Sequence, residues 1–309
     1  AKDDVQEVKV VTSEACFSME KGQSSEVFDY YNTRIQIGNE PLKYHFEIRG
    51  NDGEVVYFNR YGVVKEPMKT YEFVLIPNFS TPEWAKGAVM YQIYTDRFYN
   101  GDPDNDVVTG EYYYLGARSE KVEDWNQKPA KAMAIREFYG GDLQGVLDKL
   151  DYLQELGVEV IYFNPLFVSP SNHKYDIQDY DYIDPHFGRI VKDGGEILPE
   201  GCADEEIHRR GMKVILDGVF NHCGSFNKWM DREKIYLKEG TYEPGAYISA
   251  DSPYRDFFKF YNEDPGAWPD NGSYDGWWGH ETLPKLNYEE SVKLETYILR
   301  IGKKWVSPP

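Results

Sequence analysis

The sequence is poor in cysteine and contains no long apolar run. Its three cysteines, Cys16, Cys202 and Cys223, are odd in number and far apart, so they predict neither a disulfide framework nor a cysteine-based metal site. This pattern favours a reducing compartment, and we expect a cytoplasmic protein rather than a secreted one. No stretch approaches the ~18 consecutive apolar residues of a transmembrane helix, so we expect no membrane partner.

Positive charge is also scarce. The 309 residues include 34 Lys and Arg against 53 Asp and Glu, a net charge of −19. This balance argues against nucleic acid or an anionic membrane surface as a partner. No glycine-rich phosphate loop follows a predicted strand, which disfavours a nucleotide-binding α/β protein. The chain begins with neither Met nor an apolar segment, and we expect that its natural start is missing.

Residues 1–80 alternate apolar and polar positions, as strands of an all-β module do. Turn residues separate the strands every 8–12 residues or so, which predicts a small β-sandwich whose first part is missing. Tyr30, Tyr31 and Tyr44 could form a platform for a sugar, but packing in a core or an interface is the favoured interpretation. The predicted strands are 5–11, 28–37, 42–49, 55–59 and 71–76.

Residues 84–309 alternate predicted strands and helices, which favours a parallel sheet, either a barrel or a doubly wound sheet. A polar segment rich in Tyr and Asp, residues 169–201, follows the second strand, where binding surfaces are commonly built. The predicted strands are 89–95, 158–163 and 212–216, and the predicted helices are 145–156, 204–210 and 292–305.

Two groups of polar residues are candidates for sites. Asp217, Asn221 and His222 follow the buried strand 212–216, so they lie at its carboxyl end, although an ordinary loop would look similar. The second group, residues 100–106, offers several oxygen ligands for a hard cation, but such a segment by itself more often forms a turn. It does not match the spacing of an EF-hand.

Six motifs in this order resemble the α-amylase family, glycoside hydrolase family 13, and in particular its neopullulanase and cyclomaltodextrinase branch. The resemblance covers almost the whole chain, and residues 1–80 resemble the N-terminal starch-binding-type domain of that branch. The motifs are Tyr91-Gln-Ile-Tyr-Thr-Asp-Arg-Phe98, the Asn-rich segment 100–106, Phe138-Tyr-Gly-Gly-Asp-Leu143, Asn172-His-Lys-Tyr-Asp176, Asp217-Gly-Val-Phe-Asn-His222 and Leu283-Pro-Lys-Leu-Asn287.

The resemblance implies a (β/α)8 barrel over residues 84–309, with an inserted subdomain at about 221–289, and an enzyme that hydrolyses α-glucans. His222 then donates a hydrogen bond to the sugar in subsite −1, and the ring of Tyr175 stacks under that sugar. Asn221 and Asp176 support the site. Further substrate-binding candidates are Asp217, Trp277, Trp278 and His280, with core packing as the alternative for the tryptophans.

The resemblance also implies Ca²⁺ and a homodimer. The branch often dimerises through its N-terminal domain, which would place Tyr30 and Tyr31 in an interface. The residues that match its calcium loop are Asn100, Asp102, Asn105, Asp106, Gly140 (backbone) and Asp142.

The chain departs from the family pattern in its catalytic residues. The family is retaining, with an Asp nucleophile in a Gly-x-Arg-x-Asp motif and a Glu acid/base on later strands. That motif is absent, so we expect the carboxylates beyond Pro309 and a barrel truncated after its third strand–helix region. The short helix after Gly201 also suggests a skipped segment near residues 201–207.

The alternative function is that of a non-catalytic carbohydrate-binding or interaction protein. The substrate stays open among maltodextrin, pullulan and cyclodextrin. It also stays open whether the enzyme hydrolyses only α-1,4 bonds or both α-1,4 and α-1,6 bonds.

Overall fold

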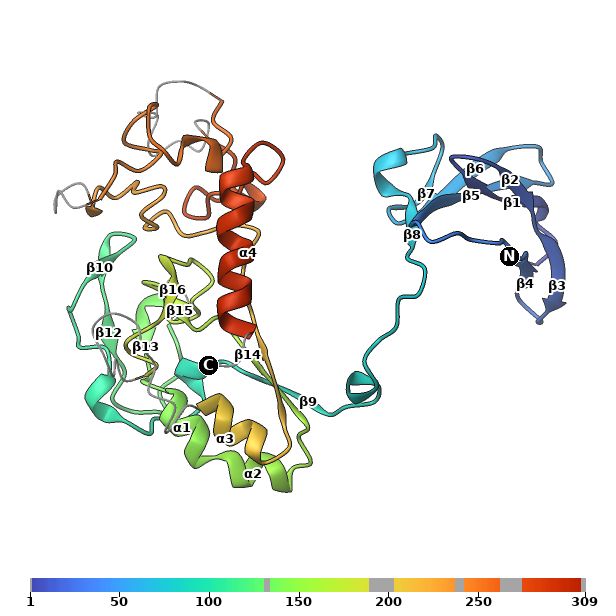
Figure 1. The fold of residues 1–309 in the computed structure, drawn as a ribbon. Coiled ribbons are helices and arrows are strands. Elements are labelled where there is room, and N and C mark those ends of the chain that lie inside the picture. Colours follow the sequence, from blue (N-terminus) through green and yellow to red (C-terminus); the bar gives the residue numbers. More distant parts are fainter. Residues whose placement is uncertain (1, 131–133, 189–202, 237–241, 262–273, 307–309) are drawn as a thin grey trace. The chain divides into compact units, whose positions relative to one another are not determined.

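The chain forms two compact units, Ala1–Lys86 and Gly87–Pro309, and each is described by itself. The structure, a computed structural model, describes residues 2–130, 134–188, 203–236, 242–261 and 274–306 (Figure 1). The predicted polar segment 169–201 and the suspected break at 201–207 fall partly outside these residues. Within the described part of the chain, no helix combines the length and apolar character needed to cross a bilayer.

The first unit is built on an antiparallel sheet in the order β2-β1-β5-β6-β7, with β8 also paired to β5. Strands β3 and β4 form a separate hairpin. The predicted strand 28–37 is wrong in length, because pairing with β3 ends at Glu20↔Asn32 and leaves the following residues without a partner strand. The strands are β1 Val5–Thr12, β2 Cys16–Ser18, β3 Glu20–Ser24, β4 Asp29–Asn32, β5 Leu42–Gly50, β6 Val55–Asn59, β7 Gly62–Val64 and β8 Phe73–Leu75.

Aromatic rings hold one face of this sheet together. Phe46 lies between Tyr44 and Phe58 at centroid distances of 5.6 and 6.1 Å, and Phe73 contacts Phe58 at 5.4 Å. Tyr44 is therefore a packing residue, in line with the simpler interpretation of the tyrosines here.

The second unit contains three parallel strands, β9 (Met90–Ile93), β14 (Val160–Phe163) and β17 (Lys213–Leu216), in the order β17-β14-β9. All three predicted strands are thus present, and their parallel pairing agrees with the predicted strand–helix repeat. Their connections carry three helices. These are α1 Leu143–Asp148, α2 Leu150–Glu155 and α3 Ala203–Arg209, and α4 Val292–Val306 follows near the C-terminus (Figure 1).

Helices α1 to α3 cover the strands through one apolar core. Val146, Leu150 and Leu153 of the first two helices pack with Ile93 and Ile161 of the strands, and each is 0% exposed. The prediction of one continuous helix over 145–156 is wrong, because the Lys149 N–H turns to Val146 O, only three residues back, and separates α1 from α2.

A second core lies between α4 and the long loops. Leu294, Ile298 and Ile301 of α4 pack with Trp229 of a loop and Tyr180 of β16 (Asp179–Ile183). The expected subdomain 221–289 therefore shares its core with α4, and its boundaries stay a prediction. The remaining strands are β10 Tyr113–Tyr114, β11 Ala117–Arg118, β12 Glu120–Lys121, β13 Glu137–Phe138, β15 Phe167–Val168 and β16 Asp179–Ile183. The described 3-10 helices are η1 Lys69–Tyr71, η2 Glu83–Ala85, η3 Thr95–Arg97, η4 Pro103–Asn105, η5 Ala134–Arg136, η7 Arg255–Phe257 and η9 Trp277–Gly279.

Candidate functional site

Asp217, the first polar residue after β17, organises the carboxyl end of the parallel strands. Its Oδ2 accepts hydrogen bonds from the hydroxyls of Tyr162 (2.9 Å) and Tyr175 (3.0 Å). Its Oδ1 accepts from the Val219 N–H at 3.1 Å. Burial and the nearby carboxylate raise the pKa of both tyrosines, so both phenols stay protonated and act as donors. Asp217 thus fixes the outer end of the Tyr175 ring.

Two histidines fix the backbone of Tyr175. The Tyr175 N–H donates to His173 Nδ1 at 3.0 Å, and His222 Nε2 donates to the Tyr175 carbonyl at 2.9 Å. His222 Nδ1 then accepts from Asn221 Nδ2 at 3.3 Å, so both ring nitrogens have partners. Burial lowers the pKa of both histidines, which keeps them neutral near pH 7. Tyr175 is therefore held at its nitrogen, its carbonyl oxygen and its hydroxyl.

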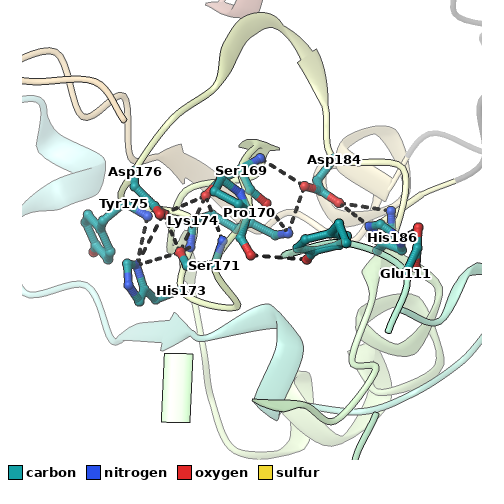
Figure 2. Close-up of polar contacts among 11 residues, drawn as sticks. Glu111, Ser169, Pro170, Ser171, His173, Lys174, Tyr175, Asp176, Asp184 and His186 are labelled. Carbon is teal, nitrogen blue, oxygen red and sulfur yellow. Dashed lines mark hydrogen bonds and ion pairs between the residues drawn. The ribbon is translucent and has the colours of Figure 1, made fainter. Parts of the chain in front are cut away.

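The segment before Tyr175 is anchored by the buried carboxylate of Asp176. Its Oδ1 accepts from the hydroxyls of Ser169, at 2.6 Å, and Ser171 (Figure 2). Burial alone would raise the pKa of Asp176, but His173 and the two hydroxyls stabilise the anion, and the net effect is a lowered pKa. This agrees with the supporting role that the resemblance implies for Asp176.

Lys174, next to Tyr175 in the chain, lies in a buried ion pair. Its Nζ is 2.7 Å from Asp184 Oδ2, and the two side chains are 1% and 3% exposed. Asp184 also accepts from the Ser169 N–H at 3.0 Å and contacts His186 Nδ1 at 2.9 Å, and His186 Nε2 reaches Glu111 at 3.1 Å (Figure 2). Burial raises the pKa of Asp184, but Lys174 and His186 outweigh it and lower the pKa to about 2. The contacts of Asp184 with Lys174 and His186 thus hold the loop before Tyr175 in place.

Two tryptophan rings stack outward from the ring of His222. Its ring lies 4.8 Å from that of Trp277 at an interplanar angle of 18°, and Trp277 lies 4.3 Å from Trp278 at 12°. His222 is 3% exposed, whereas Trp278 is 80% exposed. His280, the third residue predicted here, is exposed, and its N–H bonds to the Trp277 carbonyl at 3.0 Å.

The six residues predicted to bind calcium come together in space. The Asp142 carboxylate accepts from the N–H groups of Gly101 (3.2 Å), Asp102 (2.8 Å) and Gly145 (2.6 Å), which joins the loop to the start of α1. Asp106 accepts from Asn100 Nδ2 at 2.9 Å and forms an ion pair with Lys121.

Two amide oxygens of this loop are available to a cation. Oδ1 of Asn100 and Oδ1 of Asn105 are buried and have no hydrogen-bond partner among the described residues. Gly140 has φ +83°, and a Cβ there would lie 1.9 Å from Asp106 Oδ1, so the backbone approaches the loop closely. The described residues contain no metal-binding group of three or more His, Cys, Asp or Glu. A metal here would therefore depend on the amide and carbonyl oxygens that Ca²⁺ accepts.

Four residues of the site were not assigned a role from the sequence: Tyr162, His173, Lys174 and Asp184. His173 and Lys174 belong to the motif Asn172-His-Lys-Tyr-Asp176. The position of Lys174, a charged residue between His173 and Tyr175, is the feature of the sequence that could have indicated its role. Tyr162 looked like an ordinary strand residue. The Tyr31 hydroxyl donates to Val5 O at 3.2 Å, and Tyr30 is 56% exposed, so their place in an interface stays a prediction.

Comparison with known proteins matches both units of the chain to family models. The family model "Alpha amylase, catalytic domain" matches residues 92–308, and "Alpha amylase, N-terminal ig-like domain" matches residues 1–77. Neopullulanase 2 of Thermoactinomyces vulgaris is 36% identical over 292 residues, covering 93% of this chain and 44% of that protein. The cyclomaltodextrinase of Thermoanaerobacter pseudethanolicus is 34% identical over 306 residues, covering 92% and 44%.

A solved structure shows the same fold. The type III pullulan hydrolase from Thermococcus kodakarensis superposes with a TM-score of 0.60 and 29% identity, covering 99% of this chain and 50% of that one. The chain thus spans less than half the length of the curated relatives named above. It belongs to the α-amylase family, glycoside hydrolase family 13, with the family's N-terminal Ig-like domain preceding sequence of its catalytic domain.

Proposed function

We propose that the protein is a retaining α-glucan hydrolase in which Tyr175, Asp217 and His222 form the sugar-holding part of subsite −1. The observation that carries this proposal is the three-point fixation of Tyr175 by His173, His222 and Asp217. An aromatic face that cannot turn presents a fixed surface to the apolar face of a glucosyl ring. The names of the relatives, neopullulanase and cyclomaltodextrinase, support an α-glucan as the substrate.

These residues bind and orient the sugar. Hydrolysis with retention needs two carboxylates about 5–5.5 Å apart, one as nucleophile and one as acid/base. We assign Asp217 to binding, because its oxygens accept the hydrogen bonds that hold Tyr162, Tyr175 and the Val219 backbone. His222 donates from Nε2 to Tyr175, so its first contribution is to position that ring, and its contact with the sugar stays a prediction.

Sugar release from maltodextrin, pullulan and cyclodextrin, measured as new reducing ends with the full-length enzyme, tests this function. We expect Tyr175→Ala and His222→Ala to lower kcat/KM on maltodextrin by at least about tenfold, because each removes part of the preorganised surface. Tyr152→Ala is the matched control, since this tyrosine of α2 is 52% exposed. Unchanged kcat/KM in both site variants would refute the assignment. Glucan binding without turnover in the wild type would favour the carbohydrate-binding alternative.

The same protein would bind Ca²⁺ through the loop at Asn100–Asp106, Gly140 and Asp142. The two buried amide oxygens without partners support this proposal. The ion would join the loop to the start of α1, which Asp142 caps. Calcium binding followed by titration calorimetry, with Asn105→Ala as the variant, tests it, and an unchanged affinity in that variant would refute this placement.

A second copy of the chain is the proposed protein partner. Val27, Phe28 and Tyr30 are 58%, 54% and 56% exposed, so the β3–β4 hairpin carries apolar side chains in solvent. Such a patch suits a homodimer interface. For the compartment we propose the cytoplasm, supported by the unpaired Cys16 and Cys223.

A further inference from the structure

His186 lies between two carboxylates that belong to different segments of the second unit. Its Nδ1 is 2.9 Å from Asp184 Oδ1, and its Nε2 is 3.1 Å from Glu111 Oε1 (Figure 2). The side chain of His186 is 19% exposed and that of Asp184 is 3% exposed, whereas that of Glu111 is 38% exposed. The ring therefore bridges a buried anion and an anion at the surface, which are far apart in the chain.

Only the protonated ring of His186 can donate to both carboxylates. A neutral imidazole carries one N–H, so its other nitrogen would direct a lone pair at an anion. Protonation also balances the local charge, because the ring and Lys174 then offset the two carboxylates. Burial lowers the pKa of His186, as does Lys174, but the contacts with Asp184 and Glu111 outweigh both and raise it. The phenol of Tyr112, whose ring lies 6.5 Å from the imidazole, keeps its proton because burial raises its pKa.

Both ends of this bridge contact the segment that directly precedes Tyr175 in the chain. At the buried end, Asp184 pairs with Lys174 Nζ at 2.7 Å. At the exposed end, the residue next in the chain, Tyr112, donates from its hydroxyl to the Pro170 carbonyl at 3.1 Å (Figure 2). The protonation of one imidazole therefore bears on how firmly the Tyr175 segment is held.

We propose that His186 is a pH-dependent positioning residue, which fixes the Tyr175 segment while its protonated ring bridges the two carboxylates. The inference rests on the proposed function, which assigns Tyr175 to the sugar. When the ring loses a proton, the more exposed Glu111 gives way, and the bridge opens at that end. A group whose pKa is raised on folding contributes fully below its ordinary value, here 6.5, and this contribution is lost as the pH rises through the raised value. Sugar affinity should therefore fall over that interval.

The test follows sugar affinity and the protonation of His186 across pH in the full-length enzyme. Titration calorimetry uses a thio-linked maltotetraose, whose glycosidic sulfur atoms resist hydrolysis, from about pH 5.5 to about pH 9. We expect the dissociation constant of the wild type to rise about fivefold over the interval in which the His186 ring signal titrates in NMR. His186→Gln keeps an amide donor but no titrating group, so it should bind as weakly at every pH as the wild type does at alkaline pH.

Two further variants separate the bridge from a general effect of alkaline pH. Glu111→Gln removes one carboxylate, so the His186 signal should titrate at lower pH and the fall in affinity should move with it. Because the Glu111 side chain is 38% exposed, this variant should fold even where His186→Gln does not. His208→Gln, at an exposed histidine of α3, is the matched control and should keep the pH profile of the wild type.

Each contrary outcome overturns a defined proposal. If the wild type binds the sugar with an affinity that stays flat while His186 titrates, the positioning role is wrong and the proposed function stands. The same holds if the pH profile of Glu111→Gln matches that of the wild type. A His186→Gln variant that binds more weakly but keeps the wild-type profile would show that the ring acts only by packing, which also overturns the positioning role. If the wild type binds the sugar at no pH, the proposed function fails and the positioning role with it, even where the His186 signal titrates as expected.

Discussion

Replacing Lys174 with Met should destabilise the second unit strongly. The Lys174–Asp184 pair, at 2.7 Å, has a gross attraction of about 6 kcal/mol at an effective dielectric constant of ~20. Desolvation of both groups offsets much of this, but removing only Lys174 leaves a carboxylate buried without its cation. Loss of one partner from a buried pair typically costs about 3–5 kcal/mol. For a unit of this size, that corresponds to a fall in Tm of roughly 6–20 °C.

Thermal unfolding followed by circular dichroism at neutral pH provides the measurement. Lys228→Met is the control, because Lys228 pairs with Asp179 at 3.4 Å where the side chains are 22% and 20% exposed. Its loss should cost less than about 1 kcal/mol. The double variant Lys174→Met with Asp184→Asn should recover part of the stability, since no buried charge remains. A Tm of Lys174→Met equal to that of the control would refute the reasoning.

The same pair predicts a pH dependence with a definite sign. The pKa of Asp184 is lowered to about 2 in the folded protein, whereas its ordinary value is 3.8. A depressed carboxyl pKa stabilises the fold above the ordinary value, and this contribution is lost as the pH falls towards the folded value. In Lys174→Met the pKa of Asp184 should rise, so its neutral form appears at higher pH. The stability gap between wild type and variant should therefore narrow as the pH falls below about 4, in melts recorded across that range.

Three further predictions concern the calcium loop and the first unit. Gly140→Ala should lower the free energy of unfolding more than Gly157→Ala does. Both glycines have positive φ (83° and 82°), but of the two only Gly140 has other atoms within 4 Å of an added Cβ. Equal losses of unfolding free energy in urea would contradict this. Lys121→Met should tighten Ca²⁺ binding in calorimetry, because the Lys121 ammonium pairs with Asp106 and competes with the ion; weaker binding would contradict this. Tyr30→Asp should weaken self-association in sedimentation equilibrium, because a charge replaces an exposed ring on the β3–β4 hairpin; an unchanged dissociation constant would exclude this interface.

The strands with a regular pattern were predictable from the sequence. Strand β6 has the predicted bounds, 55–59, and β14 and β17 lie within the predicted apolar runs. Strand β3 was missed because Glu20–Ser24 is exposed throughout and carries no alternation. Its pairing with β4 depends on a hairpin partner, and local preference cannot reveal it.

The members of the site were more predictable than their contacts. Tyr175, Asp217 and His222 were named through motifs of the sequence, and they do meet in space. The Tyr162 to Asp217 bond joins residues 55 positions apart, and only the register of β14 with β17 brings them together. The burial of Lys174 likewise depends on packing by Phe138 and Phe187, at 5.5 and 5.0 Å from its Nζ, which no local pattern shows.

The bridge between His222 and Lys285 has a consequence for the order of folding. The two residues are 63 positions apart (285 − 222), and closing such a loop costs on the order of 4 kcal/mol in chain entropy. The stack of Trp277 on His222 requires the same closure. The parallel strands and α1 to α3 have their own apolar core and can form without it. During synthesis on the ribosome, the scaffold can therefore be in place before residues 277–287 have emerged, and the sugar-holding surface is completed only when they do.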